Sequence, residues 1–200
     1  MRKISGLGIA AIIVGLIVIY GIYWYNSTIG TNEGVISSWA NVETTYQRRN
    51  DLIPNIVATA KKYAEFEQQT LIGVIEARSN ATSIKVDASE LTEENIAAYS
   101  KAQSAVSTGL GRLLATYENY PDLKANENFK ELINELSRSE NRISVARTRY
   151  NDAVKIYNVK IKRFPGNIMA GVYGFDEAAF FKADEGAEKA PDVGNLFGAN

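Results

Sequence analysis

The chain has 200 residues, which is enough for one domain but leaves little room for two. Its 22 basic and 23 acidic residues give a formal net charge of −1. No basic stripe is present that could neutralise a row of phosphates, so no nucleic-acid partner is expected. Cysteine and histidine are both absent, which excludes disulfides, thiolate metal sites and catalytic designs that need an imidazole. We therefore expect no metal and no other cofactor.

Residues 4–25 are predicted to form a transmembrane signal-anchor helix. Arg2 and Lys3 precede this segment, and no further charged residue appears before Glu33. At about 1.5 Å per residue, the segment is roughly 33 Å long, close to the thickness of a hydrocarbon core. A cleaved signal peptide is the alternative, but that reading requires a small-residue cleavage site. The segment ends instead in aromatic residues typical of a membrane interface, namely Tyr20, Tyr23, Trp24 and Tyr25.

The charges that flank this segment predict its orientation. Arg2 and Lys3 lie on one side, and the other side has no lysine or arginine before Arg48. The positive-inside rule then places residues 1–3 in the cytoplasm and the remainder of the chain on the opposite side of the membrane. One face of the segment carries small residues that are compatible with packing against another membrane helix: Gly8, Ala11 and Gly15.

Residues 26–164 are predicted to form an all-α, elongated antiparallel bundle of three to four long helices. Apolar residues recur at alternating steps of three and four, the period of coiled-coil packing. The first seam shifts register after Tyr63 and resumes at Leu71, and Thr92 and Asn126 are candidate caps for the next two helices. The seams are Val35, Trp39, Val42, Tyr46, Arg49, Ile53, Ile56, Ala60 and Tyr63; Ile96, Tyr99, Gln103, Val106, Leu110, Leu113 and Tyr117; and Phe129, Ile133, Leu136, Glu140, Ile143, Arg147, Tyr150, Val154, Tyr157, Ile161 and Phe164.

Pro54 lies inside the first of these helices. Proline removes one helical hydrogen bond and frees the carbonyl of Asn50, at a cost on the order of 3 kcal/mol when nothing compensates. The apolar residues before Pro54 do not favour a new helix start. We predict that the helix continues with a kink, and that an arginine, an asparagine or a water donates to the freed carbonyl.

Three charged residues occupy seam positions, namely Arg49, Glu140 and Arg147. Buried charges are costly unless they are paired, so an interhelical polar network is one prediction. Its function would be to fix the helix register, as polar seam residues do in coiled coils. The alternative is that the long side chains extend to solvent at the edge of the bundle. The residues that could complete the network are Asp51, Asn55, Asn151 and Asn158.

Residues 165–200 form a tail rich in glycine and phenylalanine. Pro165 and Gly166 end the last long helix, and the composition beyond them does not support another one. The tail is nevertheless too apolar for free disorder, so we expect it to pack partly on the bundle. The alternative is that it docks a partner or the membrane surface through Phe175, Phe180 and Phe181.

Several separated blocks, in the same order, resemble the LemA family of bacterial membrane proteins over roughly residues 5 to 183. They are "WANVETTYQRRNDLIPNIVATAKKYAEFE", "YPDLKANENFKEL", "ENRISVARTRYNDAVKIYNVKIKRFPGNIMA" and "GFDEAAFF". The resemblance implies a single anchor in the bacterial inner (plasma) membrane, followed by an elongated helical bundle in the cell envelope. It implies no catalytic residues, because the family has no established activity. Other LemA-like proteins are described with the N-terminus outside the cell, whereas the charges here predict a cytoplasmic N-terminus.

Three functions are compatible with the sequence. The first is a non-enzymatic scaffold or adaptor that presents its bundle to a protein partner or to further copies of itself, and the missing catalytic inventory favours it. The second is a binding module for a small apolar ligand or lipid, suggested by Tyr99, Tyr117, Tyr150 and Tyr157. The third is a hydrolase that uses carboxylates alone, which no pair of acidic residues in the sequence supports.

Overall fold

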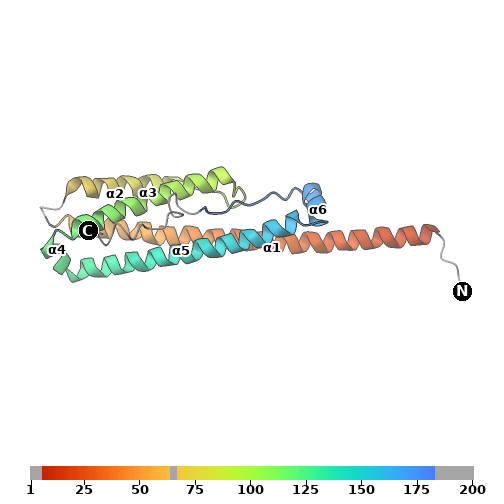
Figure 1. Cartoon of the computed structure of the whole chain (residues 1–200), viewed down its shortest axis with the longest axis horizontal. Coiled ribbons are helices and arrows are strands. Elements are labelled where there is room, and N and C mark those ends of the chain that lie inside the picture. Colours follow the sequence, from red (N-terminus) through yellow and green to blue (C-terminus); the bar gives the residue numbers. More distant parts are fainter. Residues whose placement is uncertain (1–5, 64–66, 183–200) are drawn as a thin grey trace, which may run out of the picture.

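A computed structural model describes residues 6–63 and 67–182 of the chain (Figure 1). Within these ranges every regular element is a helix, so the prediction of an all-helical chain with a long apolar N-terminal helix is confirmed. The predicted cytoplasmic residues 1–3, the first two residues of the predicted anchor and the tail beyond residue 182 lie outside the described ranges. The helices are α1 (Gly6–Ala60), α2 (Gln68–Ser83), α3 (Glu93–Tyr117), α4 (Pro121–Ala125), α5 (Glu127–Lys162) and α6 (Gly166–Tyr173).

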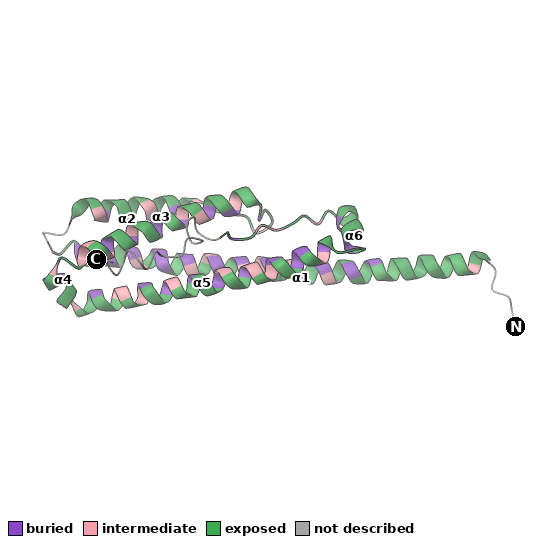
Figure 2. Ribbon diagram, viewed as in Figure 1, coloured by how far each residue is buried: buried purple, intermediate pink, exposed green. Residues whose placement is uncertain are grey.

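Helix α1 contains both the apolar segment that was predicted to be an anchor and the first helix of the bundle. Its 55 residues run without a break through the predicted domain boundary at residue 26 and make a rod about 80 Å long. The first part of the rod is exposed along almost its whole surface, whereas the second part buries one stripe (Figure 2). Among the described helices, α1 alone is long and apolar enough to cross a membrane.

The second part of α1 pairs with α5, and α2 pairs with α3 to form a hairpin beside them (Figure 1). The apolar pattern predicts that the first bundle helix continues past the register shift at Tyr63 and ends at residues 78–83, and this prediction was wrong. Helix α1 ends at Ala60, and α2 begins at Gln68. The register shift after Tyr63 explains the break, because a continuous helix would turn Leu71 and Val74 away from the seam. In α2 both residues are buried.

Helix α3 approaches α2 closely at Gly109. A Cβ atom at that position would lie 3.4 Å from Cγ2 of Val74, at van der Waals contact, so the two helices pack closely there. The predicted caps are also confirmed. The Thr92 hydroxyl accepts a hydrogen bond from the Asn95 backbone N–H at 3.3 Å, and the Asn126 side chain accepts one from the Phe129 N–H at 2.9 Å. These local signals fix where α3 and α5 begin.

Helix α1 continues through Pro54, as predicted. Arg78 of α2 donates from Nε to the Asn50 carbonyl at 2.7 Å, which confirms that an arginine satisfies the acceptor freed by the proline. The Asn50 carbonyl that Pro54 leaves free thus links the α2–α3 hairpin to α1. A bend of the helix axis at this point stays a prediction.

Candidate functional site

A layer of polar side chains crosses the bundle between two apolar clusters. One cluster includes Tyr46, Tyr99 and Ile143, and the other includes Ile53, Val106 and Leu136. On each of the three helices, one polar seam residue separates a member of the first cluster from a member of the second. The layer consists of Arg49 of α1, Gln103 of α3 and Glu140 of α5, together with Ser107 of α3.

The guanidinium of Arg49 holds this layer together, and the residue is fully buried. Its Nη1 donates to Ser107 Oγ at 2.7 Å and to Glu140 Oε1 at 3.2 Å. Its Nη2 donates to the Gln103 carbonyl at 3.1 Å and to Gln103 Oε1 at 2.7 Å. The charge also lies 5.0 Å from the centre of the Tyr46 ring. The buried cation is therefore paired and hydrogen-bonded, which is the condition for tolerating it in a core.

The other predicted network residues do not join this layer. Asp51 and Asn55 lie on the exposed face of α1, so the prediction that they contribute to it was wrong. Each lies two residues after a seam residue, which is about 200° around the helix and therefore on the face turned away from the seam. Arg147, Asn151 and Asn158 contact the C-terminal part of the chain instead. The seven residues thus divide into a polar layer, a binding groove for the chain's own end, and surface.

Residues 175–182 follow α6 without regular secondary structure and lie along α5; this segment is here named the C-terminal strap (Figure 1). Two asparagines of α5 bind it in the same way. The Asn158 side chain donates to the Ala178 carbonyl at 2.8 Å and accepts from the Ala178 N–H at 3.0 Å. The Asn151 side chain donates to the Phe181 carbonyl at 3.1 Å and accepts from the Phe181 N–H at 2.9 Å. Each carboxamide therefore binds the backbone of one residue from both its donor and its acceptor.

Two tyrosines beside these asparagines add further backbone contacts. The Tyr150 hydroxyl donates to the Ala179 carbonyl at 2.9 Å, and the Tyr157 hydroxyl donates to the Asp176 carbonyl at 2.8 Å. Burial raises the pKa of both hydroxyls, because the phenolate would lose its hydration, so they stay protonated as donors. On the opposite edge of the strap, the Ala179 N–H donates to the Leu91 carbonyl at 2.9 Å.

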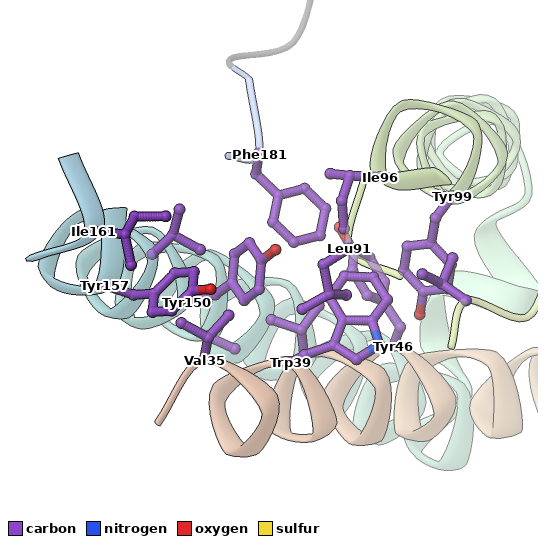
Figure 3. Packing of buried hydrophobic residues seen from close by; sticks show 14 of the residues in the cluster. Val35, Trp39, Tyr46, Leu91, Ile96, Tyr99, Tyr150, Tyr157, Ile161 and Phe181 are labelled. Carbon is purple, nitrogen blue, oxygen red and sulfur yellow. The ribbon is translucent and has the colours of Figure 1, made fainter. Parts of the chain in front are cut away.

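Phe181 anchors the strap in the core (Figure 3). Its ring stacks on Trp39 with centroids 5.8 Å apart and meets the Tyr150 ring edge-on at 5.3 Å. Arg147 covers the same ring with its guanidinium 5.2 Å from the centroid. The strap, which is the described part of the predicted tail beyond α6, packs on the bundle. Phe181 is therefore a core residue and not an exposed partner contact, whereas Phe180 is partly exposed.

The aromatic residues predicted at the membrane interface divide into two groups. Tyr20, Tyr23 and Tyr25 are exposed to different degrees, but Trp24 is buried. Its ring stacks on Tyr173 of α6 and meets Phe175 edge-on at 5.7 Å. In the predicted small-residue face of the apolar segment, Ala11 and Gly15 are exposed. Packing of this face against another membrane helix stays a prediction.

We next consider the side chains that could bind a metal ion or act as an acid or base. Within residues 6–63 and 67–182, no group of three metal-binding side chains comes together. Burial raises the pKa of Glu43, although the carboxylate lies near Lys85. Asp51 lines the same hollow, but its side chain is exposed. The face of α5 that carries the two asparagines binds the backbone of the chain's own strap.

A family model described as the LemA family matches residues 38–194. The chain belongs to the LemA family. Magnetosome protein MamQ 2 of Paramagnetospirillum magneticum is 26% identical over 199 residues, which cover 91% of this chain and 71% of that protein. Magnetosome protein MamQ of Magnetospirillum gryphiswaldense is 25% identical over 198 residues, or 90% and 71%. Protein LemA of Metamycoplasma hominis is 27% identical over 144 residues, or 72% and 62%.

The strap contacts of this LemA-family chain were missed at the level of sequence, although a signal for them was present. The dipeptide Tyr-Asn occurs at Tyr150-Asn151 and again seven residues later at Tyr157-Asn158. Seven residues are two helical turns, so the two pairs repeat along one face of α5. A repeated donor and acceptor pair on one face predicts an extended backbone beside it. The sequence analysis read the asparagines only as partners for charged seam residues.

Removing both carboxamides should detach the strap. In the double variant N151L/N158L, leucine keeps the approximate volume but leaves the backbone groups of Ala178 and Phe181 without partners. Loss of hydrogen bonds worth about 2 kcal/mol corresponds to roughly 30-fold faster amide exchange in the strap. Hydrogen exchange with mass spectrometry on the full chain measures this. The control variant N141L changes an exposed asparagine of α5 and should leave exchange unaltered. Equal protection in both variants would contradict the assignment.

Proposed function

We propose that this LemA-family chain is a membrane-anchored, non-enzymatic scaffold whose helical bundle binds a protein partner or further copies of itself. The observation that carries the proposal is the continuity of α1, which passes from the apolar segment into the buried seam without a linker. A bundle that is rigidly joined to its anchor presents the same surfaces at a fixed height above the membrane. A flexibly tethered domain would not do so.

The polar layer and the strap support the same function. Arg49 fixes the relative register of α1, α3 and α5, and the strap ties the end of the chain back to α5. Both features specify the shape of the bundle. In this proposal residues 1–3 are cytoplasmic, and the bundle lies on the periplasmic or extracellular side of the bacterial inner membrane.

The apolar-ligand alternative gains no support from the tyrosines that suggested it. Tyr99, Tyr150 and Tyr157 are buried in the first apolar cluster, and Trp39 contacts the rings of the first two. Their rings fill the core. We therefore retain the scaffold as the proposed function.

Crosslinking in membranes tests the scaffold. Membranes that contain the full chain are treated with a lysine-reactive crosslinker, and the products are purified and identified by mass spectrometry. We expect a stoichiometric adduct with a second copy or with one partner protein. Recovery of the chain alone, without either adduct, would contradict the proposal. The variant G15L, with I13L as its matched control, tells whether copies associate through the apolar segment or through the bundle.

A further inference from the structure

Helix α6 lies against α1 at the point where α1 leaves the bundle (Figure 1). Glycine permits the contact from both sides. A Cβ atom at Gly21 of α1 would lie 3.2 Å from Cε of Met169, and a Cβ atom at Gly166 would lie 3.0 Å from Nε1 of Trp24. The contact fixes the height of α6 along α1 at about residues 21–24.

That height coincides with the expected membrane boundary. A transmembrane helix needs about 20 apolar residues to cross the hydrocarbon core. Counted from Ile4, such a span ends at Tyr23, and counted from Gly6 it ends at Tyr25. Helix α6 therefore lies at the level of the lipid headgroups if α1 crosses the membrane.

The outer side of α6 is unusually apolar for a surface exposed to water. Phe164 is 80% exposed, Ile168 56% and Val172 73%. The prediction that Phe164 belongs to the seam was wrong, because α5 ends at Lys162 before the seam reaches it. Phe164 lines one hollow together with Tyr20 of α1, so this face adjoins the exposed apolar surface of α1. Continuity with the span indicates that lipid covers this face.

A hollow of about 290 Å³ opens beside this face, between α1 and the end of α5. Its lining includes Tyr20 and Trp24 from α1 and two cations, Lys160 and Arg163. Lys160 donates to Ser27 Oγ, which holds its ammonium at the same height. Arg163 is exposed, and within the described residues no carboxylate forms an ion pair with it. Two cations and two aromatic rings at headgroup depth suit a phosphate group.

We propose that α6 and Phe164 form an interfacial foot in the membrane that α1 crosses, and that the hollow binds the headgroup of an anionic phospholipid. Arg163 and Lys160 bind its phosphate, while Ile168 and Val172 contact its acyl chains. The proposal rests on the membrane anchoring that the proposed function includes. It assigns to α5 and α6 a lipid contact that lies about 140 residues beyond the anchor in the sequence.

Spin labels on single cysteines test the depth of the foot, because the natural chain contains no cysteine. The full-length variants V172C, V145C and I13C are reconstituted in vesicles of phosphatidylcholine with phosphatidylglycerol. Accessibility to oxygen and to a water-soluble nickel chelate is then measured. Val145 is a matched control, since it is a half-exposed valine on α5 away from the foot. We expect the labels at positions 172 and 13 to favour oxygen and the label at 145 to favour nickel.

The accessibility of the three labels distinguishes failure of the interfacial foot from failure of the membrane anchoring. A label at 172 that is as accessible to nickel as the label at 145, with the label at 13 in lipid, overturns the foot and leaves the anchor intact. A label at 13 that favours nickel overturns the anchoring itself. Dipolar broadening between labels at 172, without access to oxygen, shows that a second copy covers the face and likewise overturns the foot.

The headgroup site is tested with spin-labelled phosphatidylglycerol and phosphatidylcholine as probes. The ratio of their association with the full chain should fall about fivefold in R163Q, the usual weight of one basic residue near an anionic surface. The control R149Q removes an exposed arginine of α5 away from the hollow and should leave the ratio unchanged. Equal ratios in the two variants overturn the headgroup site. Competition by inorganic phosphate would assign the hollow to a soluble anion and also overturn it.

Discussion

Replacing Trp39 by alanine should lower the free energy of unfolding by about 3–5 kcal/mol, the range for a large aromatic side chain lost from a packed core. Trp39 is 0% exposed. Its ring contacts Tyr99 of α3, Tyr150 of α5 and Phe181 of the strap, with centroids 5.1 to 5.8 Å apart. One substitution therefore removes a contact that three separate parts of the chain share. No other buried side chain described here joins as many elements through its ring.

The expected result for W39A has two parts. Urea unfolding followed by circular dichroism gives the loss of stability, and hydrogen exchange shows whether Phe181 is released with the cavity. The control W39F keeps an aromatic ring and should retain most of both. A W39A variant that keeps the strap protected, even with lowered stability, would contradict the placement of Phe181 on Trp39.

Replacing Arg49 by alanine should also lower the free energy of unfolding by about 3–5 kcal/mol. The substitution leaves a cavity in the core. It also removes the guanidinium that donates a hydrogen bond to Gln103 Oε1, so this buried oxygen loses its partner. Glu140 contributes less to this effect, because its side chain is 42% exposed and water stabilises its charge. The expected loss therefore comes from the cavity and from the unpaired Gln103 side chain, and less from the ion pair with Glu140.

Two variants separate these contributions. E140Q removes only the negative charge and should cost about 1 kcal/mol, since solvent screens the pair. R49M fills most of the space without a charge and should cost less than R49A, because apolar replacements of buried ions are often tolerated. Unfolding in urea ranks the three. An R49A variant within about 1 kcal/mol of the natural chain would show that the layer does not stabilise the fold.

The sequence predicted those parts of the fold that depend on neighbouring residues. Thr92 and Asn126 cap helices because their side chains reach backbone N–H groups three residues ahead. The seam of α1 was correct from Val35 to Ala60, because its spacing follows from helix geometry. Arg49 and Glu140 were expected to pair because neither charge is stable alone in a core.

The remaining features depend on which distant segments meet, and the sequence does not contain that information locally. An asparagine such as Asn158 binds a backbone as readily as a charged side chain, so its partner depends on where the strap returns. Trp24 was predicted to lie at a membrane interface, but in the structure its ring stacks on Tyr173 of α6. The turn between α1 and α2 could have been placed from the register shift at Tyr63, but the shift alone does not distinguish a turn from a change of helix face.

Because α1 is one unbroken helix, a small change in the tilt of its apolar part displaces the far end of the bundle by a larger distance. From Trp24 to Ala60 the helix extends about 55 Å beyond the apolar segment. In a bilayer, a helix tilts to match its apolar length to the local thickness, with typical tilts near 20°. A change of about 10° at the pivot would move the far end of the bundle, where α4 lies, by roughly 10 Å. If α1 crosses the membrane as proposed, the position of that distant end depends on the thickness of the bilayer around the apolar segment.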